Sequence, residues 1–268
     1  MQALRHFLLA VQFFTRIPIT GRLADWVGFS PAMLRASSAH FPGVGWIVAA
    51  AATASYGALA LLLAPNPWAS AVAAVGCTVV TVLLTGGFHE DGLADVADGL
   101  GGSADTERAL DIMKDSRIGA YGTLALVLAL LAKVVLLSLL GSHSLAAALT
   151  ALAGAHVLSR LWPLCIVRSL PHVGDTARSK SKPLADQISP GALAAAVLWC
   201  FPALALVQQA PAAIFLGAGV VASMVAAWRM QRLFARRLGG FTGDCLGATQ
   251  QVGEIAFYLG AALTLGAL

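Results

Sequence analysis

Charged residues are scarce in this sequence. Asp, Glu, Lys and Arg make up only 11% of the 268 residues, whereas an ordinary soluble domain carries about 25%. The four cysteines show no CxxC spacing, and no basic run is interleaved with aromatic residues. These absences exclude a soluble globular domain, a disordered chain, a disulfide framework and a zinc knuckle, and they predict no nucleic-acid partner. Hydrophobic residues instead reach 58% and the mean hydropathy is +0.79, which indicates an all-α integral membrane protein.

Seven apolar stretches are long enough to cross a hydrocarbon layer of about 30 Å. They cover residues 44–64, 68–88, 121–140, 144–167, 191–208, 212–228 and 248–267. Fifteen of the 17 Lys and Arg residues lie in alternate segments, at 1–43, 89–120, 168–190 and 229–247, while the other connections carry no charge. By the positive-inside rule, the N-terminus and the charged segments face the cytoplasm. The sequence therefore predicts one polytopic domain, residues 1–268, in the cell inner (cytoplasmic) membrane.

Residues 1–40 are predicted to form a cytoplasmic or interfacial segment that begins with an amphipathic helix. Leu4, Phe7, Leu8, Val11 and Phe14 recur near one helical face. A secretory signal is the alternative, but its apolar core would be short and no small-residue cleavage site follows. We therefore expect a helix that lies on the cytoplasmic surface of the membrane.

Eight of the 13 acidic residues lie in one segment, the acidic loop at residues 89–120. Asp91, Asp95 and Asp98 have i, i+4 and i+7 spacing, so a helix would place them on one face. Like charges at this spacing repel each other, and a merely solvated acidic loop is the alternative interpretation. A divalent cation relieves the repulsion, because Mg²⁺ prefers carboxylate and phosphate oxygens. The pattern predicts a cytoplasmic Mg²⁺ site for phosphoryl or diphosphate chemistry.

The rest of the acidic loop is expected to complete that site. The glycines at 99, 101 and 102 are expected to break the first short helix, and Ser103 to cap a second one. Asp111 and Asp115 in the second part of the loop join the predicted metal ligands, and Lys114 and Arg117 are the favoured phosphate contacts. Further cations are expected on the same side of the membrane: Arg16, Arg22, Arg178, Lys180 and Lys182.

Three charged residues fall inside predicted spans, where a charge costs about 2.5–3.5 kcal/mol. Lys133 is expected to extend outward to the external surface. Arg160 and Glu254 are expected either to pair with each other or to line the floor of the site with Asp244 and Gln250.

Several strings resemble the adenosylcobinamide-GDP ribazoletransferase (cobalamin synthase) family, in that family's order over nearly the whole chain. They are FFTRIP at 13–18, FPGVG at 41–45, HEDGLADVADGLGG at 89–102, DIMKDSRIGAYG at 111–122 and FTGDCLGATQ at 241–250, followed by Glu254. The acidic string is the most specific of them. The resemblance implies an enzyme that requires Mg²⁺, joins adenosylcobinamide-GDP to α-ribazole or its 5′-phosphate, and releases GMP.

A mechanism follows as a hypothesis and gives roles to individual residues. Asp91, Asp95 and Asp98 would be catalytic by holding the metal at the diphosphate, and His89 would accept the proton of the attacking hydroxyl, a task that one of the aspartates could equally serve. The residues expected to bind substrate are Arg16, Lys114, Arg117, Arg160, Asp244, Gln250 and Glu254. The expected partners are these small molecules and the lipid bilayer, and a homo-oligomer is left open.

Three other functions also place acidic residues at a membrane. A prenyl-diphosphate transferase would show two comparable aspartate motifs in similar halves, and a CDP-alcohol phosphotransferase would show a differently spaced set. A divalent-cation transporter would place its acids at mid-membrane in broken or repeated helices. Here a single loop dominates, which favours the ribazoletransferase interpretation.

Overall fold

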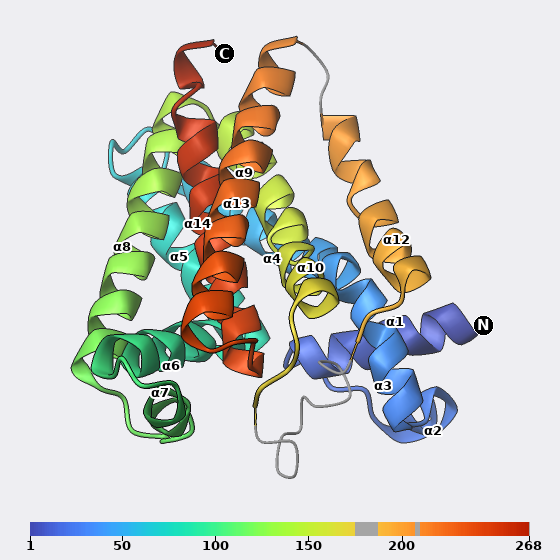
Figure 1. Ribbon diagram of the computed structural model, residues 1–268. Helices are drawn as coiled ribbons and strands as arrows, with labels where there is room; N and C mark the ends of the chain where they lie inside the picture. The colour runs from blue at the N-terminus through green and yellow to red at the C-terminus, as the bar shows by residue number, and fades with distance from the viewer. Residues whose placement is uncertain (175–186, 207–209, 268) are drawn as a thin grey trace.

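A computed structural model describes residues 1–174, 187–206 and 210–267 of the chain (Figure 1). In these residues the regular secondary structure is helical, apart from an isolated bridge between His172 and Phe241, which confirms the all-α class. The helices are α1 (Gln2–Phe14), α2 (Gly21–Val27), α3 (Pro31–Ser37), η1 (Ser38–His40), α4 (Phe41–Leu62), α5 (Ala69–Thr85), α6 (Phe88–Gly102), α7 (Thr106–Met113), α8 (Ala120–His143), α9 (Leu145–Leu158), α10 (Trp162–Ser169), α12 (Pro190–Leu198), η2 (Phe201–Leu206), α13 (Ala210–Arg237), α14 (Gly243–Ala262) and η3 (Leu265–Ala267).

Within the described part of the chain, four helical stretches are long and apolar enough to cross a membrane: Pro31–Leu62, Ala120–His143, Leu145–Ser169 and Ala213–Arg237. α5 and α6 together would make a fifth, but these two helices meet at an angle of 89°. The chain is therefore a multi-pass membrane protein. The predicted number of seven spans is not confirmed.

Two of the predicted spans, at 191–208 and 248–267, are not among these four membrane-crossing stretches, and each has its own reason. α12 has only 9 residues, too few to cross the hydrocarbon layer at about 1.5 Å per residue. α14 has 20 residues but carries Gln250, Gln251 and Glu254 in an otherwise apolar run. It packs against α6, α8, α9, α10 and α13, so its polar residues are enclosed by protein (Figure 1). An added Cβ at Gly260 would collide with the Ala218 backbone, which shows how closely α14 and α13 pack.

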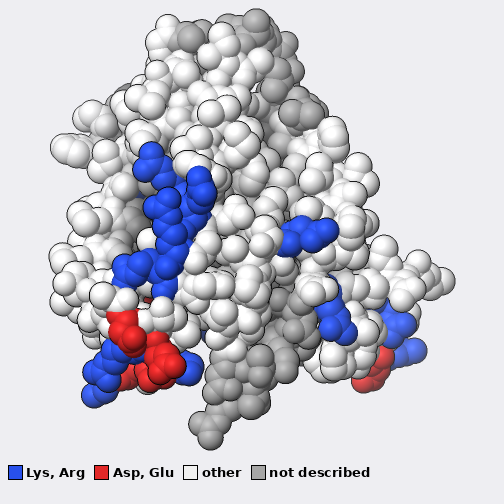
Figure 2. Space-filling model, in the orientation of Figure 1, with Lys and Arg blue, Asp and Glu red and all other residues white. Residues whose placement is uncertain are grey.

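The charged residues gather toward one end of the bundle. α1, α6 and α7 lie across this end, and the C-terminus lies at the opposite end (Figure 1). On the face shown in Figure 2, the coloured Lys, Arg, Asp and Glu side chains occupy the lower and middle parts. α1 buries Leu9, Val11 and Phe14 and exposes Leu4, so the N-terminal helix is confirmed as a helix. Its location on a membrane surface stays a prediction.

The first helix of the acidic loop ends at Gly102, as the prediction has it, but Gly99 and Gly101 lie inside α6 and do not break it. Gly99 lies against α7, because an added Cβ there would be 2.5 Å from the Met113 Cγ and 2.8 Å from the Ala109 carbonyl oxygen. The cap of α7 is also different: Asp105, not Ser103, accepts the Arg108 N–H at 2.8 Å. Small residues here serve close helix packing rather than chain reversal.

Candidate active site

A cleft opens at the charged end of the bundle, where α1 ends, α5 turns into α6 and the chain approaches α8. Its charged lining residues are Arg16, Glu90, Asp91 and Asp95. The turn into α6 requires Gly86, whose φ of +72° is a left-handed conformation and whose missing Cβ leaves room for the Arg16 guanidinium. The fold therefore brings a cation from the N-terminal segment into one cleft with the acidic face of α6.

Asp95 lies at the centre of a group of carboxylates. Partial burial, together with the nearby carboxylates of Asp244, Asp91 and Asp98, raises the pKa of Asp95 to about 7. Burial and the Asp91 charge also raise the pKa of Asp244, which lies in the first turn of α14. The two helices touch here, since an added Cβ at Gly92 would be 2.7 Å from the Asp244 carbonyl oxygen. Among the residues that the structure describes, neither Asp91 nor Asp95 forms an ion pair.

The second half of the acidic loop does not join this group. Asp111 pairs with Lys114 at 3.5 Å, and Asp115 accepts hydrogen bonds from Arg117 that lower its pKa to about 2. All four of these residues lie outside the lining of the cleft. In the described ranges no three His, Cys, Asp or Glu side chains are arranged to hold a metal ion as they stand. Three of the predicted cations lie outside the described residues: Arg178, Lys180 and Lys182.

Two further predicted catalytic residues, His89 and Asp98, do not face the cleft. His89 is only 2% exposed, stacks on Phe41 with ring centroids 5.7 Å apart, and lines a separate apolar cavity. Both carboxylate oxygens of Asp98 accept backbone hydrogen bonds, from Gly119 at 2.7 Å and Gly122 at 2.8 Å. Within the described residues, the structure therefore leaves Asp91 and Asp95 in the cleft lining without a hydrogen-bond role of this kind, and Asp244 lies beside them and accepts a hydrogen bond from the Thr242 hydroxyl at 3.3 Å.

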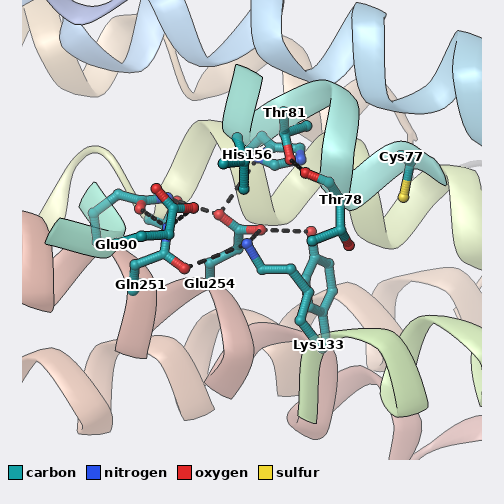
Figure 3. Close-up of polar contacts among 12 residues, drawn as sticks. Cys77, Thr78, Thr81, Glu90, Lys133, His156, Gln251 and Glu254 are labelled. Carbon is teal, nitrogen blue, oxygen red and sulfur yellow. Dashed lines mark hydrogen bonds and ion pairs between the residues drawn. The ribbon is translucent and has the colours of Figure 1, made fainter. Parts of the chain in front are cut away.

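The interior of the bundle contains a second group of charged residues (Figure 3). Lys133 is 3% exposed and its Nζ lies 3.0 Å from Glu254 Oε1, so the prediction that Lys133 extends to the external surface is wrong. The physical reason is that pairing with a carboxylate inside the bundle satisfies the ammonium group better than stretching through hydrocarbon. Glu254 is held further by Gln250 at 2.7 Å and Tyr258 at 3.1 Å.

The interior group reaches the cleft through Gln251. Its amide donates to Glu90 Oε1 at 3.0 Å, and its carbonyl accepts from Lys133 Nζ at 3.3 Å (Figure 3). Glu90 lines the cleft as well. Gln251 was not among the predicted site residues, although two adjacent glutamines, four and three residues before a glutamate in an apolar stretch, are a signal of a buried polar group.

Arg160 does not pair with Glu254 in the described residues. It is buried, its Nη1 donates to the His156 carbonyl at 2.6 Å, and its guanidinium lies 5.7 Å from the centre of the Phe41 ring. His156 Nδ1, not Arg160, lies 3.5 Å from Glu254 Oε2. Gln250, Glu254 and Arg160 therefore belong to the interior of the bundle, whereas Asp244 lies beside the cleft carboxylates.

These features define a multi-pass helical membrane protein with an acidic cleft at one end. The chain belongs to the cobalamin-5-phosphate synthase family, whose sequence model matches residues 6–262.

Three similar proteins share one name. The adenosylcobinamide-GDP ribazoletransferase of Polaromonas naphthalenivorans (strain CJ2) is 61% identical over 99% of this chain and 100% of its own length. The protein of that name from Albidiferax ferrireducens is also 61% identical, over 98% of this chain and 99% of its own length. The protein of that name from Leptothrix cholodnii is 46% identical over 96% of this chain and 94% of its own length. No solved structure matches the chain.

Proposed function

We propose that this protein is a transferase that joins adenosylcobinamide-GDP to α-ribazole, or to its 5′-phosphate, and releases GMP. The observation that carries the proposal is its likeness over nearly the full length to relatives named adenosylcobinamide-GDP ribazoletransferase. The cleft supports it independently, because carboxylates without cationic partners next to an arginine suit a substrate that carries a diphosphate.

We further propose that Mg²⁺ binds in this cleft. Asp91, Asp95 and Asp244 supply hard oxygen donors. Partial burial and the neighbouring carboxylates raise the pKa of Asp95, and a cation would offset the repulsion between these carboxylates. Mg²⁺ usually takes one or two carboxylates, with waters and substrate phosphates completing its shell. A ligand set that lacks three converging side chains therefore suits Mg²⁺ bound together with a diphosphate. When bound, the ion would neutralise phosphate charge and orient the diphosphate.

The residues of the chain then have separate tasks. Arg16 contacts a phosphate oxygen of the donor, since its guanidinium lies in the same cleft as the carboxylates. The acceptor hydroxyl forms a bond to the phosphorus on the cobinamide side, and the bond from that phosphorus to the GMP oxygen breaks. The hydroxyl proton passes to a cleft carboxylate, because His89 does not line the cleft.

We propose that the cleft faces the cytoplasm of a cell inner membrane. Fifteen of the 17 Lys and Arg residues lie in the segments at 1–43, 89–120, 168–190 and 229–247, which favours that side by the positive-inside rule. The N-terminus would lie on the same side.

The test is release of GMP from adenosylcobinamide-GDP by the full-length protein, with α-ribazole present, in Mg²⁺ and in EDTA. We expect release only with Mg²⁺, and a loss of at least about 10²-fold in Asp95→Asn. Asp111→Asn is the matched control, because its exposed carboxylate pairs with Lys114 outside the cleft lining and should keep the wild-type rate. Wild-type turnover in Asp95→Asn would refute the assigned site.

A further inference from the structure

The carboxylate of Asp98 accepts hydrogen bonds from the backbone at the start of helix α8. Asp98 is 8% exposed, and its two oxygens accept the N–H groups of Gly119 and Gly122 at 2.7 and 2.8 Å. Gly119 is the N-cap of α8, so these N–H groups belong to the helix end that has no partners of its own. A negative charge is also favourable at the positive end of the α8 dipole.

The two glycines make this contact possible. An added Cβ at Gly119 would be 2.5 Å from Asp98 Oδ1, and one at Gly122 would press on the Asp98 carboxylate and lie 3.0 Å from the Ala94 carbonyl oxygen. The start of α8 therefore rests directly on α6 at these two positions. This explains two glycines of the string GAYG at 119–122, which the proposed chemistry does not use.

We propose that Asp98 is a positioning residue and not a metal ligand. It fastens the segment before α8 to α6, and that segment contributes Ser116 and Ile118 to the cleft wall. On the same face of α6, Asp91 and Asp95 line the cleft and stay available for a ligand. The inference rests on the proposed function, because it divides the three aspartates of one motif between two tasks.

Substitutions on either side of this contact should have the same effect. Asp98→Asn replaces one accepting oxygen with an NH₂ group that faces a backbone N–H, so one of the two bonds is lost. Gly122→Ala pushes the carboxylate away without removing any charge. Both variants are expected to lower kcat per folded molecule about tenfold. Because they break the same contact, kcat of the double variant should be no lower than that of the less active single variant.

The metal readouts separate positioning from ligation. We would titrate Mg²⁺ in the GMP-release assay and measure Mn²⁺ binding to the substrate-free protein by electron paramagnetic resonance. For Asp98→Asn and Gly122→Ala, the Mg²⁺ concentration at half-maximal GMP release and the Mn²⁺ concentration at half-maximal binding should both stay within twofold of wild type. Gly217→Ala is the glycine control, because nothing lies within 4 Å of an added Cβ there.

A Mn²⁺ or Mg²⁺ midpoint raised tenfold or more in Asp98→Asn, but unchanged in Gly122→Ala, would overturn the proposal. If Asp98→Asn does not fold, Gly122→Ala alone decides: an unchanged kcat per folded molecule contradicts positioning. Failure of the proposed function would be seen differently, as a wild-type protein that binds Mn²⁺ but releases no GMP. The Mn²⁺ comparison between variants would still decide the role of Asp98 in that case.

Discussion

Two groups of charged residues in this molecule follow opposite rules. In the interior group, Lys133, Glu254, Gln251 and Glu90 form a connected set of ion pairs and hydrogen bonds across α8, α14 and α6. In the cleft, Asp91 and Asp95 lie near Asp244 and form no ion pair within the described part of the chain, where Arg16 is the cation that lines the cleft. Charges enclosed in a low-dielectric interior need an ion-pair or hydrogen-bond partner, whereas carboxylates that lack a cationic partner persist only where a ligand or water reaches them.

The comparison shows why charge alone does not mark a functional residue. Glu254, in the family string near the C-terminus, holds helices together, while Asp244, ten residues earlier, lies beside the cleft. What separates them is whether the opposite charge is already present in the protein. A carboxylate group that lacks its counter-charge in a cleft is the better candidate for binding a cation.

Removing one partner of the interior ion pair should strongly lower the stability of the protein. Lys133→Met leaves Glu254 buried without its ammonium partner, and we expect the protein to lose about 3–5 kcal/mol of stability. Unfolding in detergent micelles, followed by circular dichroism, measures this loss. Lys133→Met combined with Glu254→Gln should recover part of it, and the exposed Lys114→Met should change little. Equal losses in the single and double variants would show that the pair is not what holds these helices.

Removing the cation of the cleft should change substrate binding rather than stability. Arg16→Ala is expected to raise KM for adenosylcobinamide-GDP about tenfold or more, because a charge-assisted bond to phosphate contributes about 1.5–3 kcal/mol. Steady-state kinetics with purified protein measure it. Arg117→Ala is the control, since Arg117 pairs with Asp115 and does not line the cleft, and its KM should stay within about twofold of wild type. A larger effect from Arg117 than from Arg16 would move the phosphate contact to the acidic loop.

Metal binding in the cleft should depend on pH, with a smaller effect than the two substitutions above. The pKa of Asp95 is raised to about 7, so between pH 8 and pH 6 this carboxylate becomes mostly protonated and loses affinity for a cation. The Mn²⁺ midpoint of the substrate-free protein should therefore be about tenfold higher at pH 6 than at pH 8. The same raised pKa means that metal-free protein loses stability as the pH rises from about 4 through 7, because ionisation is unfavourable in the folded state. Asp111→Asn should keep the tenfold ratio, and a ratio near one would contradict the crowding of the cleft carboxylates.

The sequence predicted the class of the protein more securely than the contacts of its side chains. The scarcity of charge predicted a helical membrane protein, and the acidic string predicted helix α6 with Asp91 and Asp95 on one face. The same spacing could not show that Asp98 accepts hydrogen bonds from the backbone of α8, since Gly119 and Gly122 lie more than 20 residues away in the sequence. Nor could it show that Lys133 meets Glu254, 121 positions later, because pairing inside a bundle depends on which helices are neighbours.

The most direct test of the account is Mn²⁺ binding to the substrate-free protein, measured by electron paramagnetic resonance in wild type, Asp95→Asn and Asp111→Asn. We expect saturable binding of Mn²⁺ to wild type and to Asp111→Asn, and binding at least about tenfold weaker in Asp95→Asn. Equal binding by all three proteins, or weaker binding in Asp111→Asn alone, would contradict a metal site built on the cleft face of α6.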